Sequence, residues 1–189
     1  MKITTVLSSP NIKGNTSIPL KLFEDKATAA GHEVNRINLA KLNIAGCIGC
    51  GACQSVADAP GCSQNDDGSI LYQGMIDADL TILATPLYCW GFTSIGQAAV
   101  ERCIALVSGY GTDQYSSLID GKKLALLVTC GGPEADNVDL LPVVIDRMTD
   151  FVKTKVAGKY ILPLCTTPDA IKPEADKLST KMVEELLPK

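Results

Sequence analysis

Short strand-like segments alternate with helix-like segments along this chain, and that alternation restricts the fold more than any other feature of the sequence. Two of the segments, residues 78–84 and 123–129, are apolar almost throughout, which is typical of strands buried on both faces. We therefore predict a parallel sheet that is covered by helices on both faces. The predicted strands are residues 3–7, 33–39, 78–84, 123–129 and 160–164, and the predicted helices are residues 16–30, 94–107, 140–154 (with Asp139 as N-cap) and 174–187.

The chain has 189 residues, which suits one domain at roughly 150 residues per domain. We therefore predict a single α/β domain over residues 1–189, built as a three-layer sandwich. Residues 43–70 show no clear period and are predicted to be a cysteine-rich loop insertion.

Charge and composition exclude several classes of function. The net charge of −4 argues against nucleic acid as a partner, because nucleic-acid binding needs a basic face. No apolar run is long enough to span a membrane, and residues 1–10 do not look like a signal peptide, so we expect a cytoplasmic protein. A single histidine, His32, excludes a metal site made of several histidines.

Ligands of such folds bind beyond the carboxyl ends of the strands, so the loops that follow the strands are the places to inspect. The loop after the first strand leads into a helix N-terminus, where backbone N–H groups suit a phosphate. It has neither the P-loop pattern nor the dinucleotide-binding glycine pattern, and an ordinary strand-to-helix turn is the alternative. Its candidate ligand-binding residues are Ser9, Pro10, Asn11, Gly14, Asn15, Thr16 and Ser17.

The loops after the third and fourth strands supply different chemistry. Residues 85–93 include three of the chain's aromatic side chains, which could wall a flat ring, although Trp90 and Phe92 could instead belong to the core. Two glycines in the loop after residue 129 could turn backbone N–H groups towards a ligand. The candidates here are Pro86, Leu87, Tyr88, Cys89, Trp90, Cys130, Gly131 and Gly132.

A ligand with a phosphate at one end and a planar heteroaromatic ring at the other would use all three loops, and flavin mononucleotide (FMN) has this form. Ser9-Pro10 followed by Gly14-Asn15-Thr16 resembles the phosphate loop of the flavodoxin-like NADPH-dependent FMN reductases, and Thr85-Pro86-Leu87-Tyr88 resembles their ring-contacting segment. The resemblance implies a flavodoxin-like fold with strand order 2-1-3-4-5, FMN as cofactor, and a homodimer or homotetramer. Asn11 departs from this family, which often has a basic residue there.

Four of the eight cysteines fall within 16 residues: Cys47, Cys50, Cys53 and Cys62. A [4Fe–4S] cluster needs four thiolates, and ferredoxin sequences begin with the same two-residue gaps between cysteines. A four-thiolate zinc site and a metal-free loop of thiols or a disulfide are the alternatives. The cysteine segment with Asp66-Asp67 also resembles the iron–sulfur flavoprotein branch of the family, which implies that these cysteines bind a [4Fe–4S] cluster.

These features predict an oxidoreductase in which FMN and a [4Fe–4S] cluster pass electrons from NAD(P)H or ferredoxin to a small acceptor. No side chain looks like a dedicated catalytic acid, base or nucleophile, which suits chemistry carried by a cofactor. The alternatives are a cluster-free NAD(P)H-dependent FMN, quinone or nitro reductase and a non-enzymatic FMN electron carrier. We expect Arg102 at the surface, Asp66 and Asp67 in a turn or helix cap, and Cys103 and Cys165 in the core.

Overall fold

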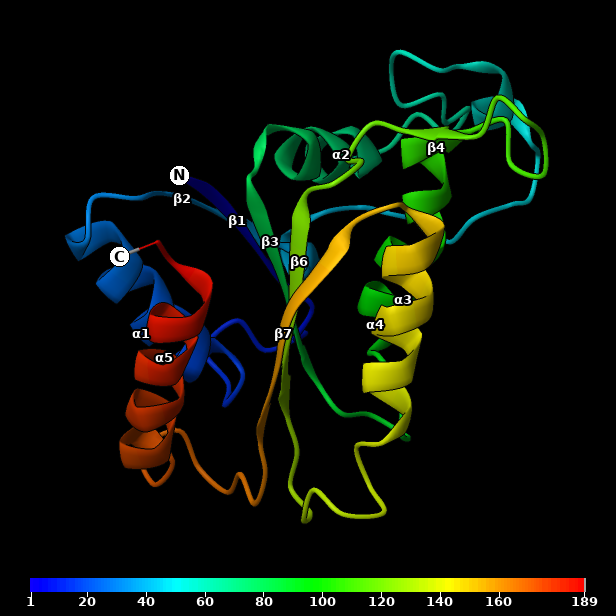
Figure 1. The fold of residues 1–189 in the computed structure, drawn as a ribbon. Helices are drawn as coiled ribbons and strands as arrows, with labels where there is room; N and C mark the ends of the chain where they lie inside the picture. Colours follow the sequence, from blue (N-terminus) through cyan, green and yellow to red (C-terminus); the bar gives the residue numbers. More distant parts are fainter. Residues whose placement is uncertain (189) are drawn as a thin grey trace.

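A computed structural model describes residues 1–188 and contains a five-stranded parallel sheet with the order β2-β1-β3-β6-β7 (Figure 1). Counting the sheet strands alone, this is the predicted order 2-1-3-4-5, so the flavodoxin-like fold is confirmed. All four pairings are parallel, as continuous apolar strands require. The strands are β1 (Lys2–Leu7), β2 (Glu33–Asn38), β3 (Leu80–Pro86), β6 (Lys123–Thr129) and β7 (Lys155–Leu162).

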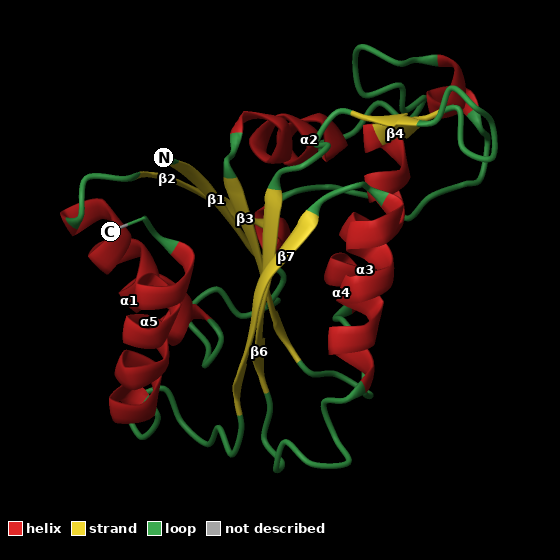
Figure 2. Ribbon diagram, in the orientation of Figure 1, coloured by secondary structure: helices red, strands yellow, loops and turns green. Residues whose placement is uncertain are grey.

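Helices cover both faces of the sheet, which explains why the central strands β3 and β6 are apolar on both sides. In Figure 2, α1 and α5 lie on one face, and α2, α3 and α4 lie on the other. Strand β6 shows the consequence, since Leu124 and Leu126 enter one core while Ala125 and Leu127 enter the other. The helices are α1 (Ser17–Ala29), α2 (Gly68–Asp77), α3 (Ser94–Arg102), α4 (Leu140–Phe151) and α5 (Lys172–Leu186).

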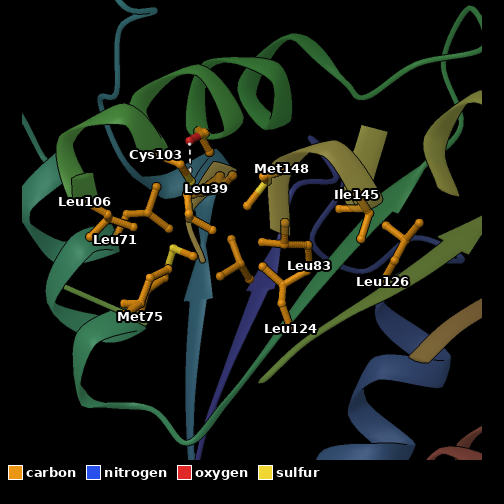
Figure 3. Close-up of a cluster of buried hydrophobic side chains, with 14 of the residues drawn as sticks. Leu39, Leu71, Met75, Leu83, Cys103, Leu106, Leu124, Leu126, Ile145 and Met148 are labelled. Atoms are coloured by element: carbon orange, nitrogen blue, oxygen red, sulfur yellow. Dashed lines mark hydrogen bonds between the residues drawn. The ribbon is translucent and has the colours of Figure 1, made fainter. Parts of the chain in front are cut away.

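The larger core lies under α2, α3 and α4 (Figure 3). In this view Leu71 and Met75 of α2 lie at one end of the cluster, and Ile145 and Met148 of α4 lie towards its other end, on the same face of the sheet. Cys103 is buried among them, as predicted.

The structure corrects three of the expected elements. Helix α2 was not predicted at all. The helix predicted over residues 94–107 ends at Arg102 and tightens into a 3-10 turn, η3 (Cys103–Leu106), which leads into the short strand β4 (Val107–Ser108). The last strand, predicted over residues 160–164, begins at Lys155 and ends at Leu162. Asp139 is the N-cap residue of α4, as predicted, although its side chain accepts no capping hydrogen bond.

The cysteine-rich segment and the ligand-side loops lie at opposite ends of the molecule. Figure 1 shows the segment that follows β2 at the top of the view, beside β4, and the loops that follow β3 and β6 at the bottom. The short hairpin of β4 and β5 (Ser116–Ser117) and the 3-10 turn η2 (Ala52–Ser55) belong to the upper end. Within residues 1–188, every helix is too short or too polar to cross a bilayer.

Candidate functional site

A cavity of about 250 Å³ lies at the carboxyl ends of the strands, between three loops. It brings together most of the residues predicted from the sequence, because parallel strands deliver their following loops to one edge. It also includes Thr129 and Cys165, which were not predicted to bind a ligand. The lining residues are Ser9, Asn11, Gly14, Asn15, Thr16, Pro86, Leu87, Tyr88, Thr129, Cys130, Gly131 and Cys165.

The loop after β1 is held in shape by its own polar groups. The amide of Asn11 donates to Ser9 Oγ at 3.2 Å, and the amide of Gly14 donates to the Asn11 carbonyl at 3.0 Å. A Cβ on residue 14 would lie 3.2 Å from the Asn11 carbonyl oxygen, which explains the glycine. Thr16 Oγ1 lies 2.6 Å from Thr129 Oγ1, so the start of α1 is tied to the end of β6.

The residues present fit the phosphate of FMN and the hydroxyl groups beside it. Within residues 1–188 the amides of Asn15 and Thr16, just before α1, donate to no protein acceptor. These N–H groups and the positive end of α1 suit a phosphate. Asn15 Oδ1 is buried without a hydrogen-bond partner in the described chain, and a sugar hydroxyl could supply the missing donor.

A second hollow, of about 360 Å³, adjoins the cavity and shares Leu87, Cys130 and Gly131 with it. Cys89, Trp90 and Gly132 line only this hollow. Trp90 is 60% exposed, so the alternative that it belongs to the core was wrong, whereas Phe92 does pack against the core.

An unusual turn presents Trp90 to this hollow. The backbones of Tyr88 and Gly91 exchange two hydrogen bonds, of 3.1 and 2.9 Å. Between them, Cys89 has φ 47° and Trp90 has φ 60°, the left-handed region that costs L-residues roughly 1–2 kcal/mol each. Strained backbone of this kind is often found at ligand sites, because the fold must hold it in place.

Two predicted cofactor residues lie outside both hollows. Pro10 is exposed, and the Ser17 hydroxyl accepts a hydrogen bond from Arg36 at 3.2 Å. Neither Gly131 nor Gly132 has a positive φ, so the turn after β6 does not need the left-handed conformation.

Cys47, Cys50, Cys53 and Cys62 line one cavity of about 110 Å³ at the opposite end of the molecule. Gly49 (φ 66°) and Gly51 (φ 73°) supply the left-handed turns by which the backbone wraps around it. Cys50 is exposed, and a hydrogen bond with the Ser63 hydroxyl lowers the pKa of its thiol. As placed in residues 1–188, no three cysteine, histidine or acidic side chains gather closely enough to hold a metal ion.

Arg102 lines the same cavity and is only 1% exposed, so the prediction that it lies at the surface was wrong. Its guanidinium donates to both carboxylate oxygens of Asp66, at 2.7 and 2.8 Å. It also donates to the Ala45 carbonyl at 2.9 Å and to the Tyr72 hydroxyl at 2.8 Å. These bonds compensate the burial of the Arg102 charge. The hydrogen bonds from Arg102 to Asp66 lower the pKa of that carboxyl to about 2.

Asp66 and Asp67 close the cysteine segment on itself, as the turn interpretation predicted. Asp66 accepts from the Gly68 amide at 2.9 Å at the start of α2, and from the Ala45 amide at 3.1 Å. Asp67 accepts from the Asn43 amide at 2.7 Å. The segment between Asn43 and Asp67 is therefore anchored at its two ends, which leaves the cysteine loop between them as one unit.

A flavodoxin-like sheet with a phosphate-type loop and exposed aromatic side chains at one edge defines the class of flavodoxin-like flavoproteins. A model of the NADPH-dependent FMN reductase family matches residues 1–144. The chain belongs to this family of oxidoreductases, and the family supports FMN as its cofactor.

Curated relatives match in sequence over part of their length. An iron–sulfur flavoprotein of Archaeoglobus fulgidus is 33% identical over 102 residues, which are 54% of this chain and 48% of that protein. One of Methanosarcina thermophila is 29% identical over 106 residues, covering 56% and 54%. The matched segment thus spans about half the length of these relatives.

Solved structures resemble the whole chain. The NAD(P)H:quinone oxidoreductase of Methanothermobacter marburgensis covers 99% of both chains with a TM-score of 0.74 and 15% identity. An FMN-dependent NADH-azoreductase of Bacillus anthracis covers 98% of this chain and 99% of its own, with a TM-score of 0.68 and 13% identity. At these identities the likeness supports the fold.

Proposed function

We propose that the protein is an FMN-dependent oxidoreductase that also carries a [4Fe–4S] cluster and passes electrons from NAD(P)H or ferredoxin to a small acceptor. One observation carries this proposal. Four cysteines, separated by as many as 15 positions from Cys47 to Cys62, line one cavity in a chain whose opposite end has a flavin-type cavity. The names of the iron–sulfur flavoprotein relatives support the same function.

The residues of this chain would divide the work between the two ends. FMN exchanges electrons singly or in pairs and a [4Fe–4S] cluster exchanges them singly, which is the chemistry that these groups supply when bound. The amides of Asn15 and Thr16 would hold the phosphate, and Tyr88 and Trp90 would cover the ring. The four thiolates would each hold one iron, in a loop that Asp66 and Arg102 fix in place.

The test is anaerobic purification followed by an absorption spectrum and by iron and sulfide analysis. We expect flavin bands with a broad iron–sulfur shoulder and about four irons per chain. Cys50→Ser should lower the iron content sharply while FMN stays bound. Cys89→Ser is the matched control, because Cys89 is also exposed but lies outside the cysteine cavity, and its iron content should equal that of the wild type. Flavin-containing protein without iron and sulfide would refute the cluster.

A cluster-free NAD(P)H-dependent reductase is the second candidate. One observation favours it. Within residues 1–188 the thiols do not lie closely enough together to hold a metal ion. Steady-state NAD(P)H oxidation that survives Cys50→Ser without loss would support this second function over the first.

The separation of the two cavities bears on the proposed assembly. Helix α3 begins at Ser94, beside the loop that carries Trp90, and ends at Arg102, which lines the cysteine cavity. Nine residues of helix span roughly 13 Å. A homodimer or homotetramer, which we propose for this protein, could bring the flavin of one chain close to the cluster of another.

A further inference from the structure

Two cysteines outside the cysteine-rich loop lie together on the wall of the cofactor cavity. Cys130 follows β6 and Cys165 follows β7, the neighbouring strand. The amide of Cys165 donates to the Cys130 carbonyl at 2.8 Å, and the amide of Cys130 donates to the Leu162 carbonyl at 3.1 Å. Both side chains line the cavity of about 250 Å³.

A local irregularity of the backbone creates this pairing. Cys130 bonds to both Leu162 and Cys165, with two residues between these partners where a regular parallel ladder has one, and the amide of Leu164 donates to the Gly132 carbonyl at 3.0 Å. Leu164 is exposed and has φ 55°. Bulges redirect the side chains that follow them, and here the bulge returns Cys165 to a position beside Cys130.

The backbone separation suits a disulfide. Strands β6 and β7 run parallel, and neighbouring strands lie about 4.8 Å apart in the hydrogen-bonding direction, here joined by the 2.8 Å bond from the Cys165 amide to the Cys130 carbonyl. That distance falls inside the range of roughly 4.4–6.8 Å found across disulfides. Because both side chains face one cavity, rotation about their Cα–Cβ bonds can bring the sulfur atoms together while the backbone stays in place.

The surroundings of the two thiols restrict which oxidant can reach them. Each sulfur donates only a weak hydrogen bond, Cys130 to the Gly132 carbonyl at 3.3 Å and Cys165 to the Leu162 carbonyl at 3.1 Å. Burial raises the pKa of both thiols, that of Cys165 to about 11. At neutral pH they are uncharged and slow to attack disulfides in solution. A redox group inside the cavity is the better partner.

We propose that Cys130 and Cys165 form a two-electron dithiol–disulfide couple in the wall of the cofactor cavity. Oxidation breaks two S–H bonds, forms one S–S bond and passes two protons and two electrons to a two-electron acceptor in the cavity, the oxidised flavin of the proposed function. Reduction by a two-electron donor in the cavity, the reduced flavin of the proposed function, reverses these changes. Only this exchange with flavin rests on the proposed function, because the couple itself is a property of the two cysteines.

The first test measures the couple without reference to flavin or iron. The full chain as purified is incubated anaerobically in buffers of stepped ratios of reduced to oxidised dithiothreitol until samples that start reduced and samples that start oxidised agree. It is then quenched in acid, alkylated under denaturing conditions and mapped by mass spectrometry. We expect a peptide pair joined through Cys130 and Cys165 that titrates as a two-electron couple. Alkylation of both cysteines at every potential, or preferential joining of Cys130 to Cys89 across the adjoining hollow, would overturn the proposal.

Two serine variants sharpen the mapping. Cys165→Ser should abolish the joined pair and leave Cys130 open to alkylation throughout the titration. Cys103→Ser should leave the pair unchanged, because Cys103 is buried outside the cofactor cavity and donates to the Ala99 carbonyl. Circular dichroism verifies the fold of each variant, and the wild-type titration decides the question even where a variant does not fold.

The second test addresses exchange with flavin. Oxidised, FMN-loaded wild type is titrated anaerobically with dithionite beside Cys165→Ser. The two proteins are compared at equal iron content. We expect the wild type to consume two more electrons per chain than the variant. Equal consumption would show that the couple does not exchange electrons with flavin. Protein that binds no FMN would instead refute the proposed function, while the first test would still report on the couple.

Discussion

At the scale of single residues, Arg102 links the cysteine segment to the body of the fold. Its guanidinium joins Asp66, Ala45 and Tyr72, and the pair with Asp66 is almost entirely buried. Removing one partner of a buried pair leaves the other charge without compensation, which costs about 3–5 kcal/mol. We therefore expect Arg102→Met to lower the free energy of unfolding by about 3 kcal/mol, measured by urea denaturation.

The control is Arg147→Met, which removes an exposed arginine from α4 and should change stability by less than about 0.5 kcal/mol. Adding Asp66→Asn to Arg102→Met should recover part of the loss, because the uncompensated charge is then gone. Equal stability of Arg102→Met and the wild type would contradict the role we assign to this arginine.

The two wrong or incomplete predictions at this scale share a physical cause. Arg102 ends a helix, where charged side chains are usually exposed, and its partner Asp66 lies 36 positions earlier in the chain. Cys165 packs against a small core cluster, as expected, but after the bulge at Pro163 and Leu164 it also lines the cofactor cavity. Both outcomes depend on contacts between distant segments, which a local pattern of residues does not contain.

At the scale of elements, the sheet was predicted well and α2 was missed. The central strands β3 and β6 are apolar almost throughout and the other three are short segments between helix-like segments, so the number and type of the strands follow from sequence alone. Helix α2 contains two glycines, Gly68 and Gly74, which disfavour a helix. A Cβ on Gly74 would lie 2.6 Å from Ile37 Cδ1, so the glycine that weakens the helical pattern also lets α2 pack closely on β2.

The loop that joins β1 to α1 provides a prediction at the same scale. Asn15→Asp places a negative charge beside the proposed phosphate position at the start of α1. We expect the FMN dissociation constant to rise at least about tenfold, equivalent to roughly 1.4 kcal/mol, as measured by quenching of flavin fluorescence.

Asn65→Asp is the matched control for this measurement. It adds the same charge at an exposed position of the cysteine segment, at the far end of the molecule, and should leave FMN affinity unchanged. Unaltered affinity in Asn15→Asp would refute the proposed phosphate position. The sequence predicted most of the cavity-lining residues of this loop. It did not predict that the Ser17 hydroxyl accepts a hydrogen bond from Arg36.

At the scale of the whole molecule, the proposed homo-oligomer can be tested on the outer face of α4. This face exposes Leu140, Val143 and Val144, three apolar side chains one helical turn apart or less. If it contacts a second copy, Val143→Glu should convert the oligomer to the monomer mass of 20.0 kDa in size-exclusion chromatography with light scattering.

Ile70→Glu introduces the same change at another exposed apolar residue, on α2, and should keep the wild-type mass. An oligomer that survives Val143→Glu would place the contact elsewhere. A wild type that runs as a monomer would contradict the proposed assembly itself.

The placement of the two cavities at opposite ends of the molecule has a consequence for steady-state kinetics. A reductase with one site must release its oxidised donor before the acceptor can enter, which gives parallel lines in double-reciprocal plots. Here a donor at one end and an acceptor at the other would not compete for space. Both could be bound at once, so the oxidised donor would inhibit competitively against the donor and not against the acceptor.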